Sequence, residues 1–417
     1  MSCTRPISSP RGSRTTFPRM SPTKTSPMSA ISLSTSGENP APVYVPGLSK
    51  VKERRPVPGE GRMVRESRTS GERLDTMANH RWRNPYRILP TLRAVVQGAY
   101  VAFFLLAGYE FHLFYTQVVA GGAVTVRRPP AVEAFLPISA LMSLKYWLLT
   151  GNFDGIHPAG LTILVAALVS AFLARKVLCS WVCPVGGISR ALEWVGRKTL
   201  WKRRKKEVLL PEWADKALCS IKYLLLAFFL YAVVLKMDAA SIVRFQRGTY
   251  NYAADAKMLL FFTSMSVVTA TTLAVLAVLS VVVKNFWCRH LCPYGALLGL
   301  VSWASPQRVV RDLPTCIDCK ACTRACPVEI RVHEKPSVWT PECTGCMSCV
   351  AACPVEDCLT VTRRGKGSWS PYLVPLLGLG AIFLFWGVAR IAGYWHSDVP
   401  VDRLADAYRQ AKDLLHP

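Results

Sequence analysis

The sequence predicts an α-helical polytopic membrane protein with about five transmembrane helices and a small, cysteine-rich α+β domain. Hydrophobic residues make up 51% of the 417 residues, and charged residues only 18%. Soluble domains carry about 25% charged residues. Long apolar stretches and clustered cysteines are the other two observations, and they divide the chain into a membrane domain and a region of cysteine-rich loops.

Residues 1–84 form a low-complexity segment that we expect to be disordered. The first 37 residues contain no Asp or Glu, and Ser, Thr, Pro and Arg dominate. Such a composition buries too little apolar area to offset the entropy lost on folding. A transit peptide shares this composition. We favour a disordered tail, or a start of translation at Met77, over a targeting segment.

Five stretches are long and apolar enough to cross about 30 Å of hydrocarbon as helices. They are residues 94–118, 157–177, 217–236, 258–283 and 370–394. A sixth stretch, 132–149, contains Pro137 and Lys145, and is predicted to be a re-entrant or interfacial helix. The membrane domain is therefore expected at 85–305, and a C-terminal transmembrane helix with a short tail at 366–417.

The distribution of Lys and Arg predicts the orientation in the inner cell membrane. Eleven of them lie between Arg175 and Lys216, whereas the loops 119–156 and 237–257 hold three each. The positive-inside rule then places residues 178–216 and 284–369 in the cytoplasm. The net charge of +25 is explained by contact with membrane lipid, because no nucleic-acid-binding module is recognisable.

One motif occurs twice in the membrane domain. Residues Cys179–Gly186 align with Cys288–Gly295, and both contain Cys-x3-Cys-Pro. Two thiols at i and i+4 on a helix face the same way, so four thiols converge if the repeats pack together. The four are a possible extra metal, cluster or redox site, although buried structural cysteines remain the alternative. These cysteines are Cys179, Cys183, Cys288 and Cys292.

Two further cysteine runs, 316–326 and 343–353, have the spacing Cys-x2-Cys-x2-Cys-x3-Cys, and Pro follows each run. In this spacing three thiolates bind one [4Fe–4S] cluster and the fourth binds the other cluster. The first cluster is assigned to Cys316, Cys319, Cys322 and Cys353. The second is assigned to Cys343, Cys346, Cys349 and Cys326. Paired zinc sites are the alternative, but they do not account for two consecutive runs of four cysteines.

Residues 310–363 resemble the bacterial two-cluster ferredoxins, and a ferredoxin domain is expected at 306–365. Together with the two Cys-x3-Cys-Pro motifs and the spans before them, residues 85–365 resemble the NapH/NosR/CcoG-type membrane ferredoxin family. This resemblance implies electron transfer between the quinone pool and a partner reductase, or reduction of a metal ion during oxidase assembly. There is no flavin-attachment domain of the NosR kind before the first span, and the additional span at 370–394 leaves the subfamily open.

Ionisable residues near membrane depth are candidates for a quinol or proton site. His157 precedes the second span, and Glu110 lies in the first, so these two are the catalytic candidates; His112, Lys145 and His290 are weaker ones. Each could equally be a satisfied interfacial residue. Cys3, Cys219 and Cys358 have no partner at ligand spacing and are predicted to be structural.

Three functions remain open. The first is a quinol-dehydrogenase-type subunit, in which electrons from the quinol pool pass through two [4Fe–4S] clusters to a redox partner protein. The second is a copper reductase or assembly factor for a respiratory oxidase, acting through the four membrane cysteines. The third is a membrane protein with structural clusters, which is disfavoured because a purely structural role needs only one cluster.

Overall fold

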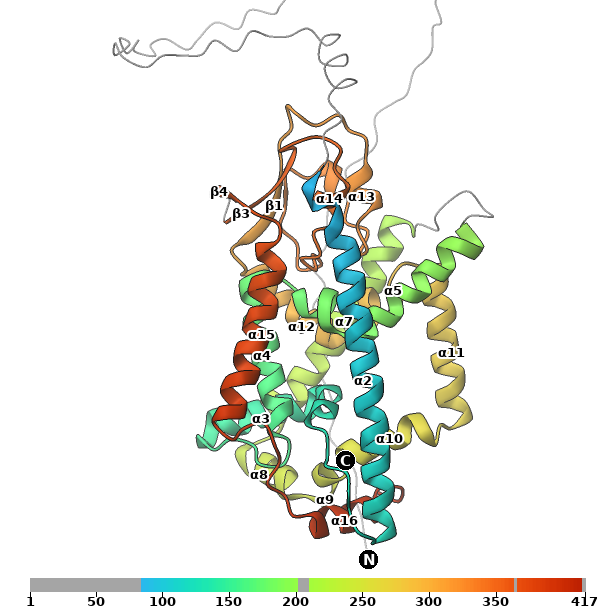
Figure 1. Cartoon of the computed structure of the whole chain (residues 1–417), viewed down its shortest axis with the longest axis vertical. Coiled ribbons are helices and arrows are strands. Elements are labelled where there is room, and N and C mark those ends of the chain that lie inside the picture. The colour runs from blue at the N-terminus through green and yellow to red at the C-terminus, as the bar shows by residue number, and fades with distance from the viewer. Residues whose placement is uncertain (1–83, 202–209, 364–365, 415–417) are drawn as a thin grey trace, which may run out of the picture. The chain divides into compact units, whose positions relative to one another are not determined.

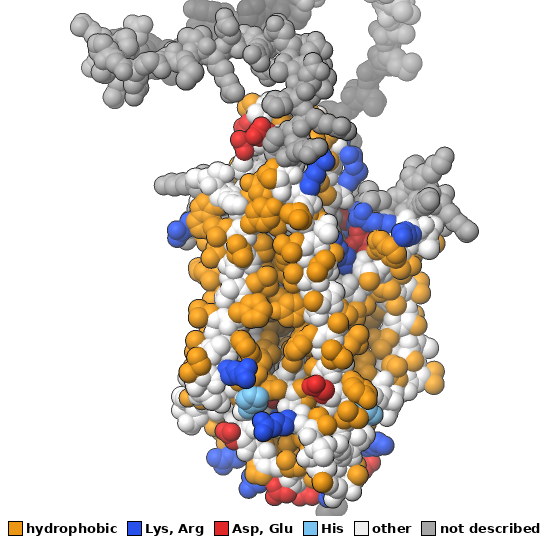
Figure 2. Space-filling view, in the orientation of Figure 1, with side chains coloured by type: hydrophobic (Ala, Val, Ile, Leu, Met, Phe, Trp, Pro, Cys, Tyr) orange, Lys and Arg blue, Asp and Glu red, His pale blue; other side chains and the backbone are white. Residues whose placement is uncertain are grey.

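Apolar helices build most of the molecule, and a small sheet covers one end of them (Figure 1). The computed structural model describes residues 84–201, 210–363 and 366–414. Four of the features discussed above therefore lie outside the described residues: the N-terminal segment, Met77, Cys3 and the basic run 202–206. Figure 2 shows an apolar band over the helices, with Lys and Arg side chains gathered towards both of its ends.

Three helices are long and apolar enough to cross a membrane. They are α2 (Leu89–Ala120), α7 (Glu212–Leu230), which continues as a π-helical turn (Tyr231–Lys236), and α15 (Leu373–Ile391). Most of the residues of these three spans are not buried within the molecule, as expected for surfaces that face lipid. They correspond to the stretches predicted at 94–118, 217–236 and 370–394.

The other two predicted spans are shorter or broken, so the count of five is not confirmed. Helix α4 (Pro158–Ala174) has 17 residues and is about 25 Å long at 1.5 Å per residue. Helices α10 (Ala254–Thr263) and α11 (Val267–Val282) meet at a bend of 76°. The Ser266 side chain accepts a hydrogen bond from the Thr269 amide and so starts α11 as a new helix. The described residues contain three spans, or four if the bent pair is one.

The end away from the sheet is built from short elements. A 3₁₀ turn (Pro130–Phe135) and α3 (Pro137–Thr150) cover the stretch predicted to be re-entrant. Helices α8 (Ala239–Arg247), α9 (Thr249–Tyr252) and α16 (Val401–Gln410) complete this end (Figure 1). Tyr408 of α16 is buried against Phe111 and Phe114 of α2, and its hydroxyl donates a 2.8 Å hydrogen bond to Asp255. The C-terminal helix is thereby anchored to the bundle.

Both Cys-x3-Cys-Pro motifs form π-helical turns rather than the α-helical turn that the sequence suggested. The turns are Leu178–Val182 and Trp287–Leu291, and they lead into α5 (Pro184–Gly196) and α12 (Pro293–Trp303). The Cys183 amide bonds to the Leu178 carbonyl at 2.8 Å, five residues back. Each proline requires an extended residue before it, so the second cysteine leaves the turn and caps the next helix.

The region between α12 and α15 contains a four-stranded antiparallel sheet in the order β2-β1-β3-β4. Its strands are β1 (Gln307–Arg311), β2 (Ser337–Val338), β3 (Leu359–Arg363) and β4 (Lys366–Trp369). A 3₁₀ turn (Val332–Glu334) and the short helices α13 (Ala321–Arg324) and α14 (Ser348–Ala352) complete it. This is the small α+β unit that the cysteine spacing predicts.

The sheet region shares one core with the ends of the membrane helices. Buried Val309 and Val361 of the sheet belong to the same hydrophobic cluster as Ala174 and Trp181 at the end of α4. Gly345, in the second cysteine run, has a φ of +64°, and a Cβ there would lie 2.8 Å from the Ala174 carbonyl oxygen. Only glycine accommodates both the left-handed backbone and this close approach.

We expect Gly345→Ala to weaken the contact between the second cysteine run and α4. Strain at a positive φ, added to the clash with Ala174, costs about 1–3 kcal/mol and lowers the melting temperature of the protein in detergent. Gly380→Ala is the control, because a Cβ at Gly380 meets nothing within 4 Å. Equal melting temperatures for the two variants would contradict the close packing of Gly345 against Ala174.

Candidate functional site

The two cysteine runs adopt the same backbone conformation. Asp318 and Lys320 in the first run have φ of 52° and 59°, and the equivalent Gly345 and Met347 in the second have 64° and 57°. Lys320 and Met347 each precede a short helix, α13 and α14. Left-handed residues at matching positions curl each loop, which turns successive backbone amides toward one point.

The thiols assigned to the second cluster surround one cavity. It is lined by Cys343, Cys346 and Cys349 of the second run and by Cys326 of the first, with apolar side chains that include Val309, Ile330 and Val338. The structure therefore brings the fourth cysteine of one run to three cysteines of the other. Soft thiolates in a dry, apolar pocket are a suitable donor set for an iron–sulfur cluster.

The thiols assigned to the first cluster are more exposed and also lie together. Cys322 and Cys353 are electrostatically coupled to each other and to Cys319, and Cys353 also to Cys316. Cys358 is buried beside Cys353 and Cys316, and burial raises the pKa of its thiol to about 12. Sequence spacing showed no partner for Cys358, because its position depends on how β3 pairs with β1.

Burial raises the pKa of four of the eight ferredoxin thiols, including that of Cys326 to about 12. Cys346 is different. Burial acts to raise its pKa, but the nearby Arg93 guanidinium is the largest of the opposing influences, and together they lower the pKa. A thiolate is the form that binds metal, so the local charges favour ligation at Cys346.

The four cysteines of the Cys-x3-Cys-Pro motifs converge, as the repeat predicts. Burial, and then the nearby Cys183, Cys292 and Cys179 thiols, raise the pKa of Cys288, and burial raises the pKa of Cys183 to about 11. Gly186 allows the tight turn, because a Cβ there would lie 2.6 Å from the Cys179 carbonyl oxygen. We call these four residues the thiol quartet.

The thiol quartet adjoins the second cysteine run through polar contacts. The Ser180 hydroxyl donates to the Thr344 carbonyl at 2.8 Å, and the Arg175 guanidinium donates to the Thr340 carbonyl at 2.7 Å. Glu342 accepts from Lys222 of α7 at 2.5 Å and lies 3.8 Å from Lys176. These contacts hold the loop between the quartet and the second cluster cavity.

The spacing of the thiols does not suit a single metal ion. Tetrahedral zinc with bonds of 2.3 Å holds its sulfur ligands about 3.8 Å apart. In the part of the chain that the structure describes, only Asp215, Cys219 and His290 place three ligand atoms within 4.8 Å of one another. Among the described residues, no three thiols of the quartet or of either ferredoxin group lie as close together as that.

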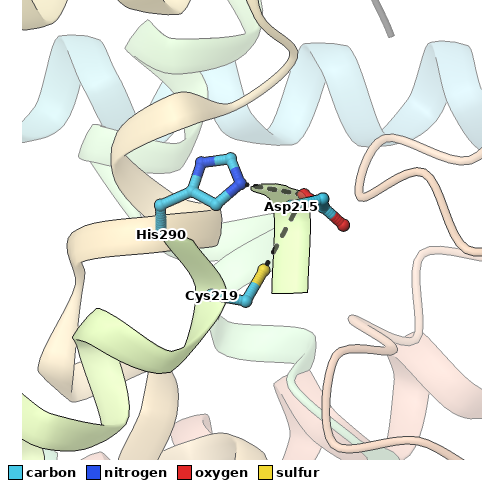
Figure 3. Close-up of side chains that lie close together, drawn as sticks. All are labelled: Asp215, Cys219 and His290. Atoms are coloured by element: carbon cyan, nitrogen blue, oxygen red, sulfur yellow. Dashed lines mark hydrogen bonds and ion pairs between the residues drawn. The ribbon is translucent and has the colours of Figure 1, made fainter. Parts of the chain in front are cut away.

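The group of Asp215, Cys219 and His290 is a hydrogen-bonded network centred on Asp215 rather than a metal site (Figure 3). His290 Nε2 lies 3.0 Å from Asp215 Oδ1, and Arg289 pairs with Asp215 Oδ2 at 2.6 Å and with Glu329. A metal-bound histidine normally donates its other N–H to an acceptor, yet the buried Nδ1 of His290 has no partner among the described residues. The network joins α7 to the second thiol motif and the cysteine loops.

The catalytic candidates lie far from the thiols and apart from each other. His157 is buried at the start of α4, with Nδ1 2.9 Å from Arg128 and Nε2 2.7 Å from the Asn251 carbonyl oxygen. Glu110 is exposed on α2 and, like exposed His112, makes no hydrogen bond to another described residue. Lys145 donates to the Val233, Val234 and Met237 carbonyls, so it caps the end of the helix that follows α7.

Two family models match the chain. A 4Fe-4S dicluster domain matches residues 308–354, and a 4Fe-4S binding domain matches residues 156–204 and again 265–311. The first match contains all eight ferredoxin cysteines. The only cysteines in the two repeated matches are the thiol quartet.

Three relatives illustrate the similarity. The protein YccM of Escherichia coli (strain K12) is 37% identical over 365 residues, which is 86% of this chain and 99% of that protein. The methylamine utilization ferredoxin-type protein MauN of Methylorubrum extorquens is 28% identical over 47% of this chain and 60% of its own. The ferredoxin-type protein NapH of E. coli is 26% identical over 46% and 59%. No solved structure matches the chain.

Arg289→Met is expected to destabilise the junction between α7 and the cysteine loops. It leaves Asp215 and Glu329, which are largely buried, without their cation, a loss of about 3–5 kcal/mol for a buried pair. Thermal unfolding in detergent measures the effect. Arg331→Met is the control, since Arg331 is 49% exposed and surface pairs contribute under about 1 kcal/mol. Similar melting temperatures for the two variants would show that the network carries little stability.

Proposed function

The chain belongs to the NapH-type 4Fe-4S ferredoxin family, and from this membership we propose that it oxidises quinol and passes the electrons through two [4Fe–4S] clusters to a redox partner protein. The iron–sulfur electron-transfer role follows from the family. The observation that supports the two-cluster assignment is the cavity in which Cys326 of one run meets Cys343, Cys346 and Cys349 of the other.

The two proposed cluster sites are adjacent, as an electron relay requires. Cys349 of the second group is electrostatically coupled to Cys322 of the first. When bound, the clusters supply one-electron transfer, and the protein sets their separation, solvent exposure and surrounding charge. The first group, with exposed Cys319, is the proposed exit towards the partner. The second group is buried against the membrane helices.

We assign the thiol quartet to a third iron–sulfur centre at the membrane end of this relay. Its four sulfur donors lie next to the second cysteine run through the Ser180–Thr344 contact, and the repeated 4Fe-4S binding domain covers both halves. The quartet also has the soft donors that Cu(I) prefers, which favours a copper-reducing function as the second candidate.

The proposed route of quinol follows from the orientation of the helices. The positive-inside rule supports a cytoplasmic location for the cysteine-rich end. His157 lies at the opposite end of α4, about 25 Å away along the 17-residue helix, and both of its ring nitrogens have partners. His157 and Glu110 are therefore proposed as contributors to proton handling or to structure at that end, and the electron donor is proposed to act close to the thiol quartet.

Cys326→Ser is expected to remove the second cluster while the first remains. Serine replaces one of four ligands in an apolar cavity, so the anaerobically purified variant should lose about half of the ferredoxin iron and the magnetic coupling between two clusters in its EPR spectrum. Cys219→Ser is the control, because Cys219 lines neither group. An unchanged EPR spectrum for Cys326→Ser would overturn the ligand assignment.

Cys288→Ser distinguishes the two candidate functions. If the quartet binds a third iron–sulfur centre, the variant loses the iron and sulfide of that centre and keeps those of the two ferredoxin clusters. The wild-type protein then contains no copper. A copper-reducing site predicts one copper per chain that the variant fails to bind. Elemental analysis with labile-sulfide determination makes the comparison. Wild-type protein that contains no copper, and only enough iron for the two ferredoxin clusters, would exclude both the third iron–sulfur centre and the copper site.

A further inference from the structure

A basic cleft lies between the membrane helices and the cysteine loops, separate from the cluster cavities. It has a volume of about 320 Å³ and lies between α2, α5 and the segments around α13 and α14. Its charged lining consists of Arg93, Arg190, Arg197 and Glu193, and Trp194 forms part of its wall. A cleft of this size accommodates a ligand headgroup.

The cleft has more positive charge than its own residues neutralise. Glu193 pairs with Arg197 at 2.6 Å and also acts on Arg190, so one carboxylate faces three guanidinium groups. Arg190 makes one 3.4 Å hydrogen bond to Gln97, and burial together with nearby Arg93 lowers the pKa of Arg190 to about 10. Arg93 is 4% exposed, and its Nε has no hydrogen-bond partner among the described residues. A buried guanidinium N–H without an acceptor is costly, so this unsatisfied donor, beside the excess positive charge of the cleft, indicates an anionic ligand.

The position of α5 indicates where that anion comes from. Helix α5 packs against α2 and α11 at the end where the apolar band stops (Figures 1 and 2). It leaves Ile188, Trp194 and Val195 between 40% and 56% exposed, and Lys198 lies 3.9 Å from the Trp194 ring. An amphipathic helix with exposed Trp and basic side chains is typical of the membrane interface. The cleft is therefore at the depth of lipid headgroups.

We propose that this cleft binds the phosphate of an anionic phospholipid, with Arg93 and Arg190 as its ligands. Guanidinium groups donate paired hydrogen bonds to phosphate oxygens, and basic pockets at helix ends are suited to such headgroups. Arg93 also acts on the Cys346 thiol. A phosphate on Arg93 would offset the positive charge near the second cluster, a consequence that rests on the proposed electron-transfer function.

Lipid binding by full-length protein, purified anaerobically and delipidated in detergent, tests the site. Native mass spectrometry with phosphatidylglycerol, phosphatidylcholine or inorganic phosphate should show a preference for phosphatidylglycerol. Arg190→Gln should weaken that binding about tenfold, as expected for one charged hydrogen-bonding group, and Arg93→Gln should do the same. Arg403→Gln is the control, because Arg403 is exposed on α16 at the other end.

Several results would overturn the proposal. One is equally tight binding of phosphatidylcholine and phosphatidylglycerol to the wild-type protein, a comparison that needs no variant. Another is unchanged binding in Arg190→Gln, which would mean that the arginines only balance cluster charge. Equally tight binding of inorganic phosphate would indicate a free-anion site.

A redox titration monitored by EPR tests the consequence for the second cluster. Its midpoint potential should be lower in phosphatidylglycerol nanodiscs than in phosphatidylcholine nanodiscs, and Arg190→Gln should remove the difference. Iron content reports separately on the proposed electron-transfer function, so a failure of either idea can be recognised by itself.

Discussion

The contact between the second cysteine run and the end of α4 is the constraint on which the rest of the structure depends. Gly345 approaches the Ala174 carbonyl too closely for any side chain, and Ser180 and Arg175 bond to backbone carbonyls of the same loop. A ferredoxin-like unit joined by a flexible linker would place its clusters at variable distances from the membrane. Here the cluster loop is part of the core of the membrane domain, so the separation of the redox sites is set by packing.

Charged residues reinforce that contact at points where burial alone would be unfavourable. Glu342 joins Lys176 and Lys222, and Arg289 joins Asp215 to Glu329. Each group connects a membrane helix or thiol motif to the cysteine loops. Removing one partner from such a buried network costs more than the pair contributes. The same networks place positive charge near the thiols, where it favours thiolate over thiol.

The opposite end of the bundle is closed by a different polar network. Arg128 contacts Glu133, Asp255 and His157, and Tyr408 of the C-terminal helix completes the group through Asp255. All these side chains have partners, as buried polar groups require. The sequence identified His157 as notable because it lies next to a break in an apolar stretch. Its side-chain partners come from two distant segments, one with Arg128 and Glu133 and one with Asn251, and no local pattern could have predicted them.

Cysteine spacing and apolar length alone determined that the chain is a membrane-associated iron–sulfur protein of this family, because both are local properties that pairwise packing cannot change. The same spacing predicted that Cys326 and Cys353 exchange between runs. Only the tertiary structure decided that the spans at 157–177 and 258–283 are short or bent, that Cys358 lies beside a cluster group, and that Arg93 and Arg190 line one cleft. Those results depend on which helix ends and strands meet, and contacts between residues as far apart in the chain as Arg93 and Arg190 leave no periodic signal in the sequence.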